Sequence, residues 1–306
     1  MNKTLPILCA IFLLHNNMLY CKKQKKIVSL DTDKMHCLAK AYRSYISKIT
    51  KNHTTGKIYF YMTNGQVIPW QDNPNKTFQE KLVSSSLADI VSEDYPVNKD
   101  ILNAPHLNYD PGRFRNSAFF QSIYGSTLSA VKKNLVEVPW LPGTMKQLSK
   151  KPIHLLFNKE NGAAAALEKV SQTLDRLPSS FKKYVLSPAG TFAWRNIAGT
   201  NRYSPHSYGI AIDISTTYSN YWRWDHQDNL DNKYVKYQNK IPEKIVSIFE
   251  NNGFIWGGRW YHYDTMHFEY RPEFFCKKPI KASVAAPVTD LVKTKSGSAF
   301  CPKPAN

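Results

Sequence analysis

The chain has 306 residues, enough for one large domain or two smaller ones, and its formal net charge is +18. Hydrophobic residues make up 42% of the chain and aromatic residues 13%, which excludes a globally disordered protein. The positive charge alone is compatible with a nucleic-acid partner, but it fits the anionic polymers and lipid head groups of a cell envelope equally well.

Residues 1–21 have the pattern of an export signal. A short basic start, Met1-Asn2-Lys3, precedes an apolar run at 5–14 that is too short to span a bilayer. Cys21 stands where a lipoprotein signal has its lipidated cysteine, although Tyr20 is larger than the residue usual before it. Lipidation, simple secretion and a permanent anchor all remain open. We predict a location in the periplasm or cell envelope, no nucleic-acid partner, and membrane association only through a lipid anchor.

Residues 22–150 form an N-terminal region to which the sequence assigns no chemistry; it would act as a cap packed on the next domain. A helix is expected over 35–46, and a strand over 57–62 that a Thr63-Asn-Gly65 turn ends. Residues 70–110 are loop-rich, with a short helix at 84–91, and their acidic side chains are expected in solvent. The sequence predicts a turn at 110–113, then a helix that the prolines of 138–142 end, with one face made by Leu128, Val131 and Leu135.

Residues 151–276 carry the pattern of a second domain, and 277–306 that of a flexible basic tail. A strand is expected at 153–157, then a helix that begins at Asn161 and stops at Pro178. A hairpin around 188–190 would follow, then an aromatic loop at 218–224 that forms either core or a substrate-stacking wall. A helix over 242–251 precedes the last strand.

Five cysteines occur, of which Cys9 would leave with the signal and Cys21 is the candidate for lipidation. The remaining three, Cys37, Cys276 and Cys301, cannot all pair with one another. The sequence leaves open whether Cys37 pairs with either of the others or Cys276 pairs with Cys301.

Metal-binding side chains occur in two short strand-like segments, Ser204-Pro-His-Ser-Tyr-Gly-Ile-Ala-Ile-Asp213 and Asp264-Thr-Met-His267. Alternation places Asp213 on one face of the first strand, and a turn at Gly209 can bring His206 to the same face. In the second strand His267 and Glu269 share a face. If the strands are neighbours, two histidines and a carboxylate converge, which is the protein half of a catalytic zinc site.

These two motifs resemble the zinc peptidases of the D-alanyl-D-alanine carboxypeptidase and L-alanyl-D-glutamate endopeptidase family, which includes vancomycin-resistance-type dipeptidases and phage endolysins. The resemblance covers residues 192–273, and more loosely the chain from Asp110. It implies that His206, Asp213 and His267 bind Zn²⁺ and that Asp264 is the general base, where the family often has glutamate.

The family also has an arginine upstream of the first motif that polarises the scissile carbonyl. Arg195 is its expected counterpart, with Arg202 as the alternative. Further candidates for groups that support the site are Ser204, which would hold a loop or a ligand, His262, which would contact the reacting peptide or orient Asp264, and Glu269.

The expected fold is α+β, an antiparallel sheet with helices on one side and zinc on the sheet face, preceded by the loop-rich N-terminal region. The expected activity is hydrolysis of a peptide bond in peptidoglycan stem peptides, of the D,D-carboxypeptidase or L,D-endopeptidase type. The alternative is an inactive metal-containing module that binds wall peptides or anionic envelope polymers.

Overall fold

A computed structural model describes residues 32–97, 105–198, 200–225 and 235–276. The predicted export signal, Cys21, Cys301 and the predicted tail lie outside the described residues. Within them, none of the helices combines the length and the apolar character that a bilayer crossing requires.

The N-terminal part begins with a helix over residues 32–41, and a three-stranded antiparallel sheet follows in the order β1-β2-β3. The expected strand at 57–62 and its turn are confirmed, whereas the expected helix ends before Ile46, which opens β1. Two short helices follow, and each begins with a reciprocal capping box, Thr77 with Glu80 and Ser86 with Asp89. The elements are β1 (Ile46–Lys51), β2 (Ile58–Met62), β3 (Val67–Pro69), α2 (Phe78–Val83) and α3 (Leu87–Ile90).

The middle of the chain builds a two-stranded antiparallel sheet, β4-β5, against which the long helix α7 packs. The prediction that Leu135 lies on a helix is wrong, because Leu135 opens β4. Pro139 is compatible with this strand because β4 pairs with β5 alone in this sheet. The N–H group that proline lacks is therefore not needed for hydrogen bonds to a second neighbouring strand. The elements are α4 (Ser117–Tyr124), α5 (Leu128–Lys132), β4 (Leu135–Trp140), α6 (Pro142–Gln147), β5 (Ile153–Asn158), α7 (Ala163–Asp175) and α8 (Ser179–Lys182).

The third sheet, β6-β8-β7, is antiparallel and carries both motif segments. Helix α10 covers one face of it, where Phe249 stacks on Phe268 with ring centroids 3.8 Å apart. Pro242 is the N-cap of this helix, as its sequence predicts. The opposite face carries Asp213 and His267, so helices lie on one side of the sheet and the candidate metal-binding residues on the other. The elements are β6 (Ala211–Asp213), α9 (Trp222–Asp225), α10 (Glu243–Glu250), β7 (Phe254–Trp256) and β8 (His267–Tyr270).

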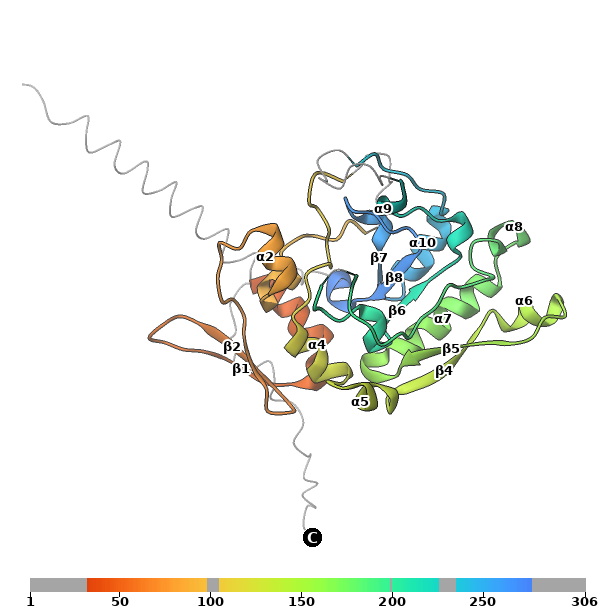
Figure 1. The fold of residues 1–306 in the computed structure, drawn as a ribbon. Helices are drawn as coiled ribbons and strands as arrows, with labels where there is room; N and C mark the ends of the chain where they lie inside the picture. The colour runs from red at the N-terminus through yellow and green to blue at the C-terminus, as the bar shows by residue number, and fades with distance from the viewer. Residues whose placement is uncertain (1–31, 98–104, 199, 226–234, 277–306) are drawn as a thin grey trace, which may run out of the picture.

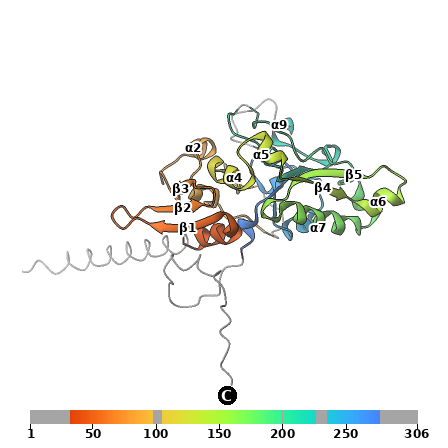
Figure 2. The same cartoon turned by 90° about the horizontal axis from the view of Figure 1, so that it is seen from below.

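The α+β fold class is therefore confirmed, as small antiparallel sheets joined by helices. Figures 1 and 2 show β1-β2-β3 at one end of the molecule and β4-β5 with α7 at the other. One hydrophobic cluster runs through both ends, from Met35 to Phe268. The domain boundary at residue 150 stays a prediction, and the β4-β5 pair spans it.

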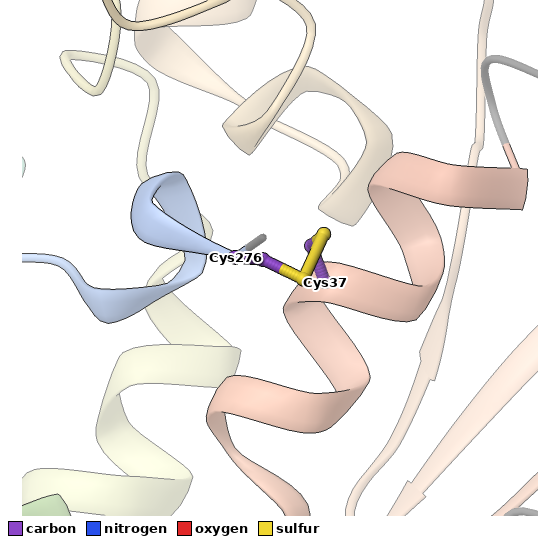
Figure 3. The surroundings of a disulfide bond; sticks show 2 residues. All are labelled: Cys37 and Cys276. Atoms are coloured by element: carbon purple, nitrogen blue, oxygen red, sulfur yellow. A yellow bond between two sulfur atoms is a disulfide. The ribbon is translucent and has the colours of Figure 1, made fainter. Parts of the chain in front are cut away.

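A disulfide joins Cys37 to Cys276, which selects one of the pairings that the sequence left open. Cys37 lies on the first helix, and Cys276 directly follows the 3-10 turn Pro272–Phe275, as Figure 3 shows. The bond therefore ties the beginning of the described chain to its end.

Candidate active site

His206, Asp213 and His267 converge, and their ligand atoms all lie within 4.8 Å of one another. The convergence follows from strand pairing, because Asp213 is the register partner of His267 in the β6-β8 ladder. The Nε2 atom of His206 lies 3.2 Å from Asp213 Oδ2, and the Nδ1 atom of His267 lies 2.9 Å from Asp213 Oδ1. Among the described residues, this group could hold a metal ion.

His206 reaches the sheet because the chain turns just before β6. Residues Pro205–Tyr208 form a 3-10 turn, and Gly209 ends it with φ +66°, a left-handed conformation that favours glycine. A Cβ at this position would also lie 2.6 Å from Leu135 Cδ2. Ser204 caps the turn, since its Oγ accepts a hydrogen bond from the His206 N–H at 3.3 Å. The turn that the sequence predicts at Gly209 is present.

The surroundings of the two imidazoles determine which nitrogens face the group. His206 Nδ1 lies 2.5 Å from the Thr191 carbonyl oxygen, which can only accept, so Nδ1 carries the proton and Nε2, which faces Asp213, is the nitrogen that can bind a metal ion. In His267 the Nδ1 atom faces Asp213, while Nε2 lies 3.7 Å from Glu269 Oε2. Both rings are buried, with 5% and 6% of their surface exposed.

The charges around the group favour a cation. Burial opposes the ionised form of Asp213, but the two imidazoles outweigh it and hold the pKa of Asp213 well below its usual range. Burial also opposes a charged His267, yet hydrogen bonding to Asp213 and Glu269 raises the pKa of His267 to about 10. A site that stabilises protons on its ligands in this way will also attract a metal ion that replaces them.

The donor set suits zinc. Two nitrogens and one carboxylate are the ligands of many catalytic zinc sites, and ligands of a tetrahedral zinc ion stand about 3.3 Å apart when the bonds are about 2.0–2.1 Å. The 3.2 Å between His206 Nε2 and Asp213 Oδ2 agrees with that spacing. The residues present therefore fit the metal.

Asp264 lies beside this group and carries an unused acceptor. Its Oδ1 atom is buried and has no hydrogen-bond partner among the described residues. Burial raises the pKa of Asp264 above its usual value, and the neighbouring Asp213 carboxylate acts in the same direction. A carboxylate of this kind in a cleft can take up a proton near neutral pH.

A cavity of about 180 Å³ opens at the site, and its lining includes Asp264 and the three candidate metal ligands His206, Asp213 and His267. The aromatic side chains of Tyr221, Trp222 and Trp260 form part of its wall. Its most unusual property is its cationic lining by five arginines: Arg113, Arg115, Arg195, Arg202 and Arg223. A cavity of this composition favours an anionic ligand.

Both candidates for the upstream arginine line the cavity. Arg195 is exposed, whereas Arg202 is half-buried and its Nε atom has no hydrogen-bond partner among the described residues. Burial lowers the pKa of Arg202 to about 10, and repulsion from Arg115 and Arg113 adds to the effect. The hairpin expected around 188–190, just before Arg195, is not formed, because Gly190 instead pairs with Asp213 at the edge of β6.

Glu269 lies under the group with its side chain fully buried. Arg115 donates to both of its oxygens, at 2.8 and 3.2 Å from Nε, and Arg271 Nη1 donates to Oε1 at 3.2 Å. These guanidinium groups outweigh burial and hold the pKa of Glu269 well below its usual range. Glu269 is therefore a charged support for His267.

The family resemblance extends loosely from Asp110 onward, but the sequence indicated no site residue within 109–115. Asp110 was expected in solvent, but it is fully buried, and its Oδ2 lies 2.6 Å from His262 Nδ1. Arg113 and Arg115 line the cavity. The proline and glycine of the 110–113 turn were the one local signal here. They predict a turn, but they do not indicate that Asp110 contacts His262.

Residues 198–270 match the protein family described as D-alanyl-D-alanine carboxypeptidase. The matched segment contains both motifs, so the family resemblance inferred from them is confirmed for this segment. No curated protein matches the chain.

Proposed function

We propose that this protein is an exported zinc metallopeptidase that hydrolyses a peptide bond in peptidoglycan stem peptides. The observation that carries the proposal is the convergence of His206, Asp213 and His267 beside Asp264, inside a segment matched to a carboxypeptidase family. The alternative, an inactive module that binds wall peptides, is disfavoured because the carboxylate needed for proton transfer is present.

In this proposal His206 Nε2, an oxygen of Asp213 and His267 Nδ1 hold the metal. Zinc, when bound, polarises the scissile carbonyl and lowers the pKa of a water molecule to about 7. The hydrogen bond at His206 Nδ1 and the charge of Glu269 keep the two rings oriented toward the metal position.

Asp264 is the proposed general base. A carboxylate oxygen of Asp264, which lines the cavity, accepts the proton of the attacking water as the new C–O bond forms. The same atom then delivers that proton to the leaving amine as the C–N bond breaks. The raised pKa of Asp264 suits both transfers, since a carboxyl group near neutrality holds and releases a proton readily.

The arginines of the cavity are proposed to hold the peptide. Arg195 or Arg202 would donate to the oxygen of the scissile carbonyl, where negative charge develops during the attack. Arg113 and Arg115 are paired with Asp110 and Glu269. Arg223 and the other of Arg195 and Arg202 are therefore the arginines that suit a peptide with carboxylate groups, as peptidoglycan stem peptides have. His262, which also lines the cavity, would hydrogen-bond to the reacting peptide.

The location of the protein is part of the proposal. A signal at residues 1–21 would deliver it to the periplasm or cell envelope, with Cys21 as the site of a lipid anchor if one is present. The net charge of +18 would then favour contact with anionic envelope polymers.

The test is incubation of the zinc-loaded protein with purified peptidoglycan fragments, followed by mass spectrometry of the products. Loss of one terminal alanine would identify a carboxypeptidase, and cleavage into two peptides would identify an endopeptidase. A chelator should abolish turnover and zinc should restore it. Asp264→Asn should retain zinc and lower kcat by several orders of magnitude, whereas His206→Ala should lose zinc. Full activity of Asp264→Asn would refute the base assignment, and binding of fragments with no turnover would favour the inactive module.

A further inference from the structure

The region upstream of the matched segment supplies a wall of the active site. We propose that Asp110, outside residues 198–270, is a positioning residue for His262 that fixes which ring nitrogen faces the substrate. The inference rests on the proposed function, because it assigns His262 a contact with the reacting peptide.

Asp110 and His262 are joined through two groups of the histidine. The backbone N–H of His262 donates to Asp110 Oδ1 at 3.0 Å, and the ring Nδ1 lies 2.6 Å from Asp110 Oδ2. Arg113 Nη1 donates to the same Oδ2 at 2.6 Å. Both side chains of the Asp110–His262 pair are buried, with 0% and 3% of their surface exposed. The carboxylate therefore determines both the position and the orientation of the ring.

The charge of Asp110 decides the tautomer. Burial disfavours its ionised form, but Arg113 and His262 outweigh burial and hold the pKa of Asp110 below its usual value. An ionised carboxylate can only accept, so Nδ1 of His262 carries the proton. In the neutral ring Nε2 is then the acceptor, and His262 lines the cavity together with Asp264 and His267.

Aromatic rings prevent other orientations of the histidine. Trp222 meets the His262 ring edge to face with centroids 4.8 Å apart, and Phe78 stacks beside it at 5.9 Å. Phe78 belongs to α2, so the N-terminal region contributes packing as well as the carboxylate. The ring has little freedom to leave the position that Asp110 sets.

The segment that carries Asp110 is itself bound to the loop that joins β7 to β8, and it packs against β7. The Tyr109 carbonyl accepts from the Tyr261 N–H at 2.9 Å, and the Pro111 carbonyl accepts from Trp260 Nε1 at 2.8 Å. Gly112 has φ +91°, and a Cβ there would lie 2.3 Å from Ile255 Cδ1. This close approach fixes the wall against β7, so Asp110 is held on a rigid support.

The experiment compares Asp110→Asn with wild type in the full-length, zinc-loaded protein. Asp110 accepts hydrogen bonds from three donors on its two oxygens. Asparagine has only one side-chain oxygen, so its NH₂ group must face one of these donors and cannot accept from it. We expect kcat to fall about 10- to 100-fold, with zinc content unchanged and KM within about threefold. Asp89→Asn is the matched control, since Asp89 is also a buried carboxylate of the N-terminal region but lies outside the cavity lining. It should keep the wild-type kcat.

A double-mutant cycle and NMR separate positioning from a general structural effect. Asp110→Asn combined with His262→Gln should be no slower than His262→Gln alone, because Asp110 acts through His262. In wild type, the ¹⁵N shifts of His262, assigned by their absence in His262→Gln, should report a protonated Nδ1. That measurement does not depend on the folding of any Asp110 variant.

Three results would overturn the inference: a kcat of Asp110→Asn within twofold of wild type, multiplicative effects in the double mutant, or a neutral His262 protonated on Nε2. Wild-type protein without zinc-dependent turnover would instead overturn the proposed function, and with it the reaction role of this pair. Turnover in wild type that Asp110→Asn leaves unaffected would overturn this inference alone.

Discussion

Replacement of Arg271 by methionine tests how strongly the chain depends on the buried charges beneath the site. Arg271 is fully buried, and it donates to Glu273 Oε1 at 2.6 Å, to Glu269 Oε1 at 3.2 Å and to the Gly112 carbonyl. Glu273 also accepts from the Tyr42 hydroxyl at 2.7 Å. Methionine fills much of the same volume but leaves a buried negative charge without its main partner.

The expected loss of stability follows from which partners remain. Removal of one member of a buried ion pair costs about 3–5 kcal/mol. Because Glu269 keeps Arg115 and Glu273 keeps Tyr42, we expect the lower end, about 3 kcal/mol, or a fall in Tm of roughly 6–10 °C. Arg271 helps to hold the pKa of Glu269 below its usual value. The stability that Arg271 contributes through this pair is therefore fully present at pH values above the pKa that Glu269 has in the unfolded chain. The difference from wild type should therefore shrink as the pH falls below about 4.

Urea unfolding followed by circular dichroism measures this difference at pH 7 and at about pH 3, where part of it should be lost. Arg176→Met is the matched control, because Arg176 is exposed, and it should change the free energy of unfolding by no more than about 0.5 kcal/mol. An Arg271→Met protein within 1 kcal/mol of wild type at pH 7 would refute the reasoning.

Three further perturbations have defined outcomes. Cys37 and Cys276 are 239 positions apart, for which chain entropy gives up to ~5 kcal/mol, so the double serine variant should lose about 2–5 kcal/mol in urea unfolding, and an unchanged midpoint would contradict this. Burial raises the pKa of Glu93 to about 7, so its ionisation destabilises the fold as the pH rises from about 4.5 through 7. Glu93→Gln removes this effect, so its free energy of unfolding relative to wild type should be about 1–2 kcal/mol higher at pH 8 than at pH 4. An equal difference at both pH values would contradict this. Gly209→Ala should lower stability by about 1–3 kcal/mol and weaken zinc binding in a metal titration, because Gly209 sets the position of His206; wild-type zinc affinity would argue against that role.

The metal group was predictable because its signal is local. Strand alternation places Asp213 and His267 on definite faces, and a turn at Gly209 accounts for His206, so one assumption, that the strands pair, brings all three together. The helix over α10 was equally accessible, since its period and its N-terminal proline agree.

Other parts depend on contacts that no local pattern contains. Asp110 stands 152 positions from His262, and an acidic residue in a loop-rich stretch is ordinarily solvated. Leu135 has helical spacing from Val131, but pairing with Asn158 across the sheet places it in a strand. In both cases tertiary partners outweigh the local preference.

The disulfide makes most of the described protein one closed covalent ring, and every residue of the candidate site lies inside it. A protease that cuts the backbone once, anywhere between Cys37 and Cys276, would therefore produce two fragments that stay bonded to each other. Such fragments would separate on a gel only after reduction. For a protein proposed to work outside the cytoplasm, this linkage would keep the proposed metal ligands, the proposed base and Asp110 in one molecule after a first proteolytic cut.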